Sequence, residues 1–226
     1  MTVASDARTL TTDPIYQPAD RESALDRRLL ALINDQRDLP FLHFMLQSLA
    51  VIVPFAVYLF LPGRFTWWLG ALYLAVNIPW FMDRFILILH NSSHRPLFKT
   101  RHGWMNHLLP WLFGPFYGET PETYYAHHLG MHHPENNLEA DVSSTMRYQR
   151  DSIWGFVRYH QRFFWGVLFE LTAYMWKRRR FKLIRRMLFG EFVFYALVAA
   201  LWSYHWRATL VVFVAPFLRA RTAKIG

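Results

Sequence analysis

Long apolar segments alternate with short polar segments along most of this chain. Residues 41–62 carry no formally charged side chain, and residues 65–81 form a second apolar run. About twenty helical residues are enough to cross the hydrocarbon core of a bilayer. The two runs therefore predict a transmembrane helical hairpin, whose second helix continues through residues 85–89. Asp83 and Arg84 interrupt that helix, and we interpret them as a core-facing ion pair, with an interfacial or cavity-lining position as the alternatives.

The second half of the chain repeats this pattern. Residues 187–204 predict a third span, residues 205–207 a short turn, and residues 208–218 a short fourth span. Between the two hairpins, residues 102–118 are rich in aromatic side chains and proline, which predicts an interfacial or re-entrant segment. Residues 151–176 are aromatic but interrupted by charges, which is typical of an amphipathic helix lying along a membrane surface.

These elements predict an all-α integral membrane protein. It would contain two transmembrane helical hairpins, with three clear spans and a short or truncated fourth, and a histidine-rich helical cap. The N-terminal segment, residues 1–40, is polar and has no basic region followed by an apolar core, so it does not resemble a secretory signal. Within it, residues 21–36 predict a short amphipathic helix with Leu25 and Ile33 on one face. We divide the chain into this segment and a membrane domain, residues 41–226.

The charge distribution indicates an orientation. The chain carries a formal net charge of +9, and seven of the ten residues 177–186 are basic. A nucleic-acid-binding protein is a poor match, because the long apolar runs would be insoluble on their own. Basic residues that flank transmembrane helices face the cytoplasm and contact anionic lipid. We therefore expect the N-terminus and the histidine-rich segments to lie on the cytoplasmic side.

Two histidine groups are the candidate chemistry. Because the chain has no cysteine, a metal would be held by histidine or carboxylate side chains. Two histidines four residues apart share one face of a helix and can reach one metal ion. His90 and His94 have this spacing, as do His128 and His132, and His133 points about a quarter-turn further round. Imidazole suits iron, zinc, copper and nickel, so the spacing alone does not select the metal.

The flanking residues predict a helix for the second group. Thr120, Pro121 and Glu122 match a helix start, and Pro134 with Asn136-Asn137 match its end. The remaining histidines are weaker candidates. His102 and His107 are five apart, a poor chelating spacing, and His160 stands alone. The sequence leaves the roles of His102, His107 and His160 open, and also the role of His127.

Five features follow one another along the chain: the predicted hairpin, His90-x-x-x-His94, His128-x-x-x-His132-His133, the basic segment and the second hairpin. This combination resembles the integral-membrane fatty acid desaturase family. The similarity covers roughly residues 40–219. It implies two iron ions in a non-haem centre, with His90, His94, His128, His132 and His133 as ligands, and places His127 beside a ligand as a hydrogen-bonding neighbour. It also implies a lipid acyl substrate, dioxygen, and electrons from cytochrome b5 or a ferredoxin. The product would be a lipid with a cis double bond.

The chain departs from this family pattern in one respect. The family carries a third histidine box after the fourth span, whereas only His160 and His205 follow His133 here. Five histidines do not fill two iron coordination spheres without carboxylates such as Glu119, Glu122, Glu135 or Asp141. We expect a C-terminally truncated chain that is inactive or binds metal weakly. The alternatives are a histidine-box hydroxylase acting on alkanes, sterols or carotenoids, and a non-catalytic partner or regulator of a complete desaturase.

Overall fold

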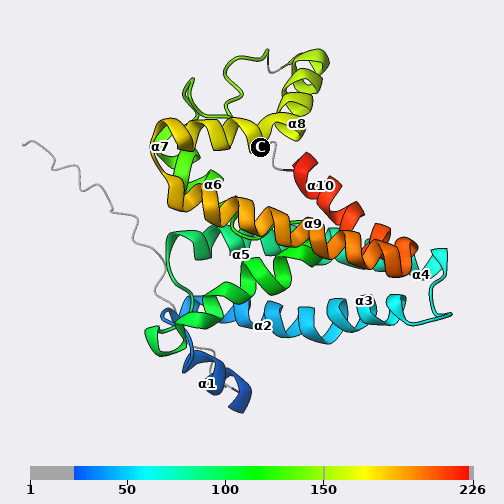
Figure 1. Ribbon diagram of the computed structural model, residues 1–226. Coiled ribbons are helices and arrows are strands. Elements are labelled where there is room, and N and C mark those ends of the chain that lie inside the picture. The colour runs from blue at the N-terminus through cyan, green and yellow to red at the C-terminus, as the bar shows by residue number, and fades with distance from the viewer. Residues whose placement is uncertain (1–22, 150, 224–226) are drawn as a thin grey trace, which may run out of the picture.

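The computed structural model describes residues 23–149 and 151–223, and these residues fold into helices joined by turns (Figure 1). The described residues contain no strand beyond an isolated bridge between Ile33 and Phe98. Three helical stretches are long and apolar enough to cross a membrane: Gln36–Phe60, Trp67–His94 and Phe181–Arg221. The prediction of an all-α fold is confirmed. Residues 1–22, the first part of the predicted N-terminal segment, lie outside the described residues.

The first hairpin is formed by four helices in two antiparallel arms. α2 (Leu39–Gln47) and α3 (Val53–Phe60) form one arm, and α4 (Trp67–Val76) and α5 (Asp83–His94) form the other. Aromatic side chains pack between the arms, as between Phe55 and Tyr73, whose ring centroids are 5.5 Å apart. α5 ends at His94. The residue before a proline favours extended backbone, and Arg95, before Pro96, adopts it.

The interpretation of Asp83 and Arg84 as a core-facing ion pair is wrong. Both side chains are exposed, and the structure gives no salt bridge between them. Arg84 instead donates a hydrogen bond to the Gln47 side chain, at 3.2 Å, and lies over the ring of Phe44. Neighbouring residues on a helix point about 100° apart, so two adjacent side chains do not face each other.

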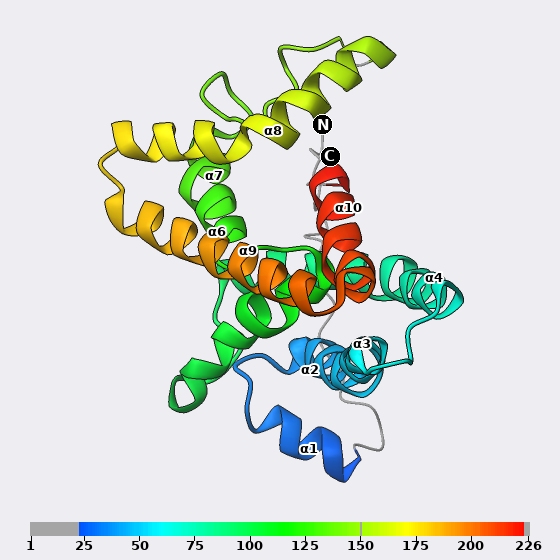
Figure 2. The ribbon, with the colours of Figure 1, turned by 45° about the vertical axis from the view of Figure 1, so that its right-hand side comes forward.

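The second hairpin folds back at His205. α9 (Phe181–Thr209) is interrupted there by non-helical backbone, and the chain continues through η8 (Leu210–Val214) into α10 (Ala215–Ala223). Figure 2 shows α10 leaving the end of α9 at a steep angle, and the rings of Phe194 and Phe217 pack 5.4 Å apart between the two helices. The His205 ring packs against Phe65, at 5.5 Å, next to the turn of the first hairpin. The predicted turn and fourth helix are therefore present.

Wide helical turns recur wherever proline interrupts a helix. Proline has no N–H and its ring clashes with the carbonyl four residues earlier, so a locally widened turn accommodates it. The described part of the chain contains five such turns, each containing or shortly preceding a proline. They are Ser48–Ile52 before Pro54, Asn77–Met82 around Pro79, Leu109–Phe113 around Pro110, His128–His132 before Pro134, and Leu210–Val214 before Pro216.

Residues 100–117 form three short helices, η4 (Thr100–His107), η5 (Leu109–Phe113) and η6 (Gly114–Tyr117). Most of the second half of this segment is buried in the protein. Tyr117 stacks on Phe85, with ring centroids 4.7 Å apart, and its hydroxyl lies 2.6 Å from that of Ser48. The segment predicted as interfacial or re-entrant is thus packed against the first hairpin.

α8 (Ile153–Lys177) is a single amphipathic helix, as predicted for residues 151–176. Its buried side chains recur every four residues and so form one stripe. They are Tyr159, Phe163, Val167, Leu171 and Met175. Beyond a short turn, α9 begins, and the two helices form a bend at the edge of the molecule that Figure 2 shows clearly.

The N-terminal helix is shorter than predicted. α1 spans Ala24–Leu30 and begins with a capping box at Ser23, whereas the pattern predicts a helix over residues 21–36. Leu25 is 50% exposed, and Ile33 leaves the helix to pair with Phe98. Backbone hydrogen bonds to the segment after His94 replace further helical turns, so this part of the chain packs next to the first histidine group.

Candidate metal centre

Two helical segments bring four histidine rings together. α5 carries His90 and His94 at its C-terminal end, while the second segment runs through α6 (Thr123–His127), η7 (His128–His132) and α7 (His133–Glu135). Ligating nitrogens of His90, His94 and His128 all lie within 4.8 Å of one another. His133 joins them, because its Nε2 is 3.0 Å from that of His128. Such a set of imidazoles can hold a metal ion.

The pairing within the second segment differs from the predicted one. The i,i+4 spacing predicts that His128 and His132 share a face, but the closer ring to His128 is that of His133, at 4.5 Å against 5.8 Å. The wide turn before Pro134 explains the difference. In such a turn residue i aligns with residue i+5, so His128 and His133 project together.

Arg180 supplies a hydrogen bond that the widened turn lacks. The carbonyl of Gly130 stands four residues before Pro134, which has no N–H to donate to it. Arg180 donates a side-chain hydrogen bond to this carbonyl instead. Gly130 also allows close packing, because a Cβ there would lie 2.7 Å from the end of the Met175 side chain. The basic segment after α8 therefore helps to hold the backbone between the histidines.

His132 is oriented by a buried carboxylate. Its Nδ1 lies 2.7 Å from Oδ2 of Asp141, whose side chain is fully buried. Asp141 also accepts hydrogen bonds from the backbone N–H and the hydroxyl of Ser143 and from the N–H of Asn137. Burial raises the pKa of Asp141, but the hydrogen bonds from Ser143 and His132 outweigh it and keep the pKa below the ordinary value. An ionised Asp141 fixes the ring of His132 through its Nδ1.

His128 is packed against Tyr124 and lies close to His90, His94 and His133. The Tyr124 ring stacks on His128 with centroids 5.1 Å apart, and its hydroxyl lies 3.2 Å from Nδ1 of His90. Burial, followed by repulsion from His90 and His133, lowers the pKa of His128 to about 3. His128 is therefore neutral near pH 7, the state in which imidazole offers a lone pair to a metal.

Three of the four carboxylates named as possible additional ligands have other partners. Glu122 forms an ion pair with Arg186, at 2.6 Å, and accepts a hydrogen bond from the Trp111 indole, at 3.0 Å. Glu135 forms an ion pair with Arg178, also at 2.6 Å. Asp141 is engaged by His132, as described above. Glu119 is buried, and neither it nor the other three belongs to the group of potential ligands found among the described residues.

The predicted helix start at Thr120 is wrong. The helix begins at Thr123, and Glu122 before it has a positive φ of 68°. The hydroxyls of Thr120 and Thr123 instead donate hydrogen bonds of 2.6 Å each to the buried Glu191 of α9. Tertiary hydrogen bonding to α9 thus replaces the local cap, and it attaches the second histidine segment to the third span.

The remaining histidines lie around this cluster. The His127 ring stacks on His132, with centroids 6.0 Å apart and planes 15° from parallel. His102 and His107 belong to η4, and His160 stacks on Phe164 within α8. Within residues 23–149 and 151–223, none of these four joins the group formed by His90, His94 and His128.

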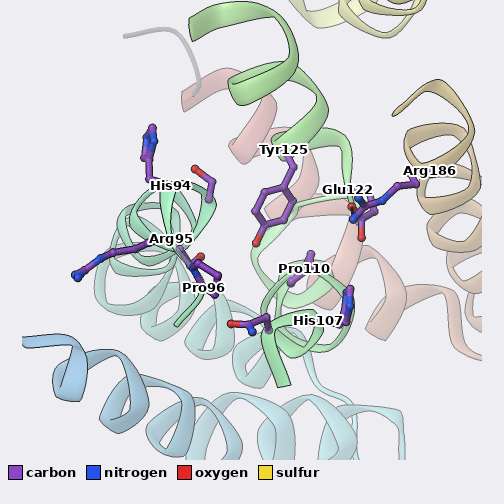
Figure 3. Close-up of a pocket in the computed structure, with 11 residues that line it drawn as sticks. His94, Arg95, Pro96, His107, Pro110, Glu122, Tyr125 and Arg186 are labelled. Carbon is purple, nitrogen blue, oxygen red and sulfur yellow. Dashed lines mark hydrogen bonds and ion pairs between the residues drawn. The ribbon is translucent and has the colours of Figure 1, made fainter. Parts of the chain in front are cut away.

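A cavity of about 230 Å³ opens at the end of α5 beside this cluster. Figure 3 shows the Tyr125 side chain projecting into the space between the end of α5 and Pro110, with Glu122 and Arg186 on the far wall. His94 and His107 lie at its rim. The cavity therefore lies between the end of α5 and the Glu122–Arg186 ion pair.

Comparison with known proteins places the chain in a family. A sequence model described as fatty acid desaturase matches residues 65–222, more than two thirds of the chain. The chain belongs to the fatty acid desaturase family. No curated protein and no solved structure matches it. With its three candidate spans, this desaturase-family chain is a membrane protein that carries a histidine group able to hold a metal ion.

Sequence reasoning missed the residues that support the histidines. Tyr124 stands four residues before His128, a helical spacing that could have indicated their contact. Arg178, Arg180 and Arg186 gave no such signal, because a run of basic residues does not show which side chains point inward. Their inward position depends on the bend between α8 and α9, which no local pattern reveals.

Proposed function

We propose that this membrane protein is an acyl-lipid desaturase, which uses dioxygen to introduce a double bond into the acyl chain of a lipid. The observation that carries this proposal is the convergence of His90, His94, His128 and His133 in a member of the fatty acid desaturase family. The cluster lies at the end of a membrane-spanning helix, where an acyl chain from the bilayer can reach it.

The residues present fit a metal centre. The described donors are imidazole nitrogens, the His128 ring is neutral, and His132 is oriented by Asp141. We propose that the metal is iron and that two ions are bound, with His90, His94, His128, His132 and His133 as their ligands. Iron would supply the strong oxidant that an unactivated C–H bond requires.

The proposed reaction balances with an external reductant. Two hydrogens leave adjacent methylene groups of the acyl chain, and two electrons come from a donor such as cytochrome b5 or a ferredoxin. Together with two protons these reduce one dioxygen to two waters. The protein would position one pair of methylene groups and exclude water, while Asp141 would hold the proton on Nδ1 of His132.

Iron content and product analysis test this proposal together. The full chain should be purified from membranes, its iron measured, and the lipids of the producing cells analysed for products lighter by two hydrogens. Product formed by the wild type would contradict the sequence-based expectation of an inactive chain, and His128→Ala should lose both bound iron and product. His107→Ala should keep both, because the exposed His107 lies outside the histidine group. A wild-type chain that binds no iron would contradict the proposal.

The same experiment separates the alternatives. A product heavier by one oxygen would identify a hydroxylase on the same scaffold. A chain without bound iron that co-purifies with a longer desaturase would identify a non-catalytic partner or regulator. A desaturated product that depends on His128 supports the function proposed here.

A further inference from the structure

The basic residues around the turn between α8 and α9 divide into two groups by their contacts. Arg178, Arg180 and Arg186 bind groups of the protein, namely Glu135, the Gly130 carbonyl and Glu122, although Arg178 and Arg186 keep 51% and 48% of their side-chain surface exposed. We call these three the inward group. The other four are also exposed, but their side chains form no ion pair or hydrogen bond with the described residues. This outward group consists of Lys177, Arg179, Lys182 and Arg185. The inward group supports the histidine segment, which leaves the outward group without a role in the site.

Large apolar side chains surround the outward group. Phe169 is 76% exposed, Trp176 64% and Phe181 44%. The rings of Trp176 and Phe181 meet edge to face across the bend, with centroids 5.1 Å apart. Exposed aromatic side chains of this size are costly in water and stable at a membrane interface. We call this surface, residues 168–188 at the junction of α8 and α9, the elbow.

An apolar groove runs along the elbow. It encloses about 550 Å³ and is lined by side chains of α8 and by Leu188 of α9, with one cation, Lys177, at its edge. The α8 side chains are Leu168, Phe169, Thr172, Ala173, Trp176 and Lys177. The groove lies on a different side of α8 from the buried stripe that includes Leu171 and Met175, so packing within the protein does not fill it.

The position of the elbow sets the environment of this groove. The third candidate span begins at Phe181, the first residue of α9. The elbow therefore lies where a membrane-spanning helix meets the membrane surface, at the depth of lipid headgroups. Cations at this depth are attracted to anionic lipids. An acidic soluble protein would match the cations but not the exposed aromatic groove.

We propose that the elbow binds an anionic phospholipid, whose phosphate contacts Lys182 and Arg185 and whose acyl chain lies in the groove beside Ala173. This site is separate from the histidine centre and does not depend on the proposed desaturase activity. Its ligand is a structural or regulatory lipid of the surrounding leaflet. The inward arginines of the same turn connect the elbow to the backbone of the histidine segment.

Native mass spectrometry of the delipidated full chain tests the site. Phosphatidylglycerol and phosphatidylcholine are titrated separately, and the affinities are compared. We expect the wild type to prefer phosphatidylglycerol. Lys182→Gln/Arg185→Gln should weaken phosphatidylglycerol binding by roughly tenfold or more and leave phosphatidylcholine unchanged. Arg28→Gln/Arg64→Gln, which removes the same charge from exposed positions elsewhere, should keep the preference.

A second variant tests the groove without changing the charge. Ala173→Trp fills it, so binding of both lipids should fall, while circular dichroism confirms that the helices persist. Inorganic phosphate should not displace the bound lipid. The proposal is overturned if the wild type binds both lipids equally, or if the control pair loses the preference as much as the elbow pair. It is also overturned if the elbow pair keeps phosphatidylglycerol but loses binding of an acidic soluble protein.

Discussion

The Nε2 atoms of His128 and His133 lie 3.0 Å apart although the two residues are five positions apart in a helix. An ordinary α-helix would place side chains five apart at an angle of about 140° to each other. The widened turn before Pro134 brings them onto one face. The geometry of the candidate metal centre thus depends on a proline that makes no contact with a metal itself.

Replacing that proline tests this relationship. Pro134→Ala restores an N–H opposite the Gly130 carbonyl, which allows the turn to tighten into an α-helix and rotates His133 away from His128. We expect metal affinity to fall by about tenfold, as for other changes that misorient a ligand. Cobalt titration followed by visible absorption measures this without requiring activity. Pro40→Ala is the control, because Pro40 lies in the first turn of α2, where its missing N–H costs nothing. Equal affinities for the two variants would contradict the role of the turn.

Asp141→Asn tests the orientation of His132. Asparagine keeps the size of Asp141 but replaces the charged acceptor that holds the Nδ1 proton of His132. Loss of such a partner typically costs between about 10-fold and 100-fold in metal affinity. Calorimetric titration of the apoprotein would measure it. Asp151→Asn removes an exposed carboxylate elsewhere and should change nothing. If both variants bind metal like the wild type, Asp141 has only a structural role.

The inward arginines make a prediction about stability. Arg186→Gln leaves the buried carboxylate of Glu122 without its ion-pair partner. Losing a charged hydrogen bond to a buried group costs about 1–3 kcal/mol, so the unfolding temperature in detergent should fall. Arg185→Gln is the matched control, since the neighbouring Arg185 belongs to the outward group and has no ion-pair partner among the described residues. Equal melting temperatures for the two variants would show that the Glu122 contact contributes little.

A close approach between backbones predicts a further loss of stability. A Cβ at Gly190 of α9 would lie 2.0 Å from the carbonyl oxygen of Pro121. Because this oxygen belongs to the backbone, the clash can be relieved only if one of the two backbone segments moves. Gly190→Ala should therefore separate α9 from the second histidine segment and destabilise the protein by about 1–3 kcal/mol. Gly103→Ala meets no atom within 4 Å and provides the control. Thermal unfolding in detergent distinguishes them, and a Gly190 variant as stable as the control would refute the contact.

The sequence indicates the helices of this protein better than their contacts. Apolar runs predict the hairpins, and the Arg95-Pro96 pair marks the end of α5, because these signals are local. The spacing of His90 and His94 likewise predicts that they share a face. The sequence does not predict three contacts: the pairing of His128 with His133, the hydrogen bond of Arg180, and the contact of Thr120 with Glu191. Each depends on a proline-widened turn or on a helix distant in sequence, and tertiary contacts there override the local pattern.

The orientation of the protein in the membrane can be tested because the chain has no cysteine. Arg64→Cys labels the exposed turn of the first hairpin, and Glu139→Cys labels the exposed loop after α7, near the histidine group. Basic segments favour the cytoplasmic side, so we expect Glu139→Cys to react with an impermeant maleimide only in inside-out vesicles. Arg64→Cys should react only in right-side-out vesicles, because α4 and α5 separate the two positions by one span. The reverse pattern would contradict the proposed cytoplasmic location of the histidines, and labelling of both from the same side would show that this span does not cross the bilayer.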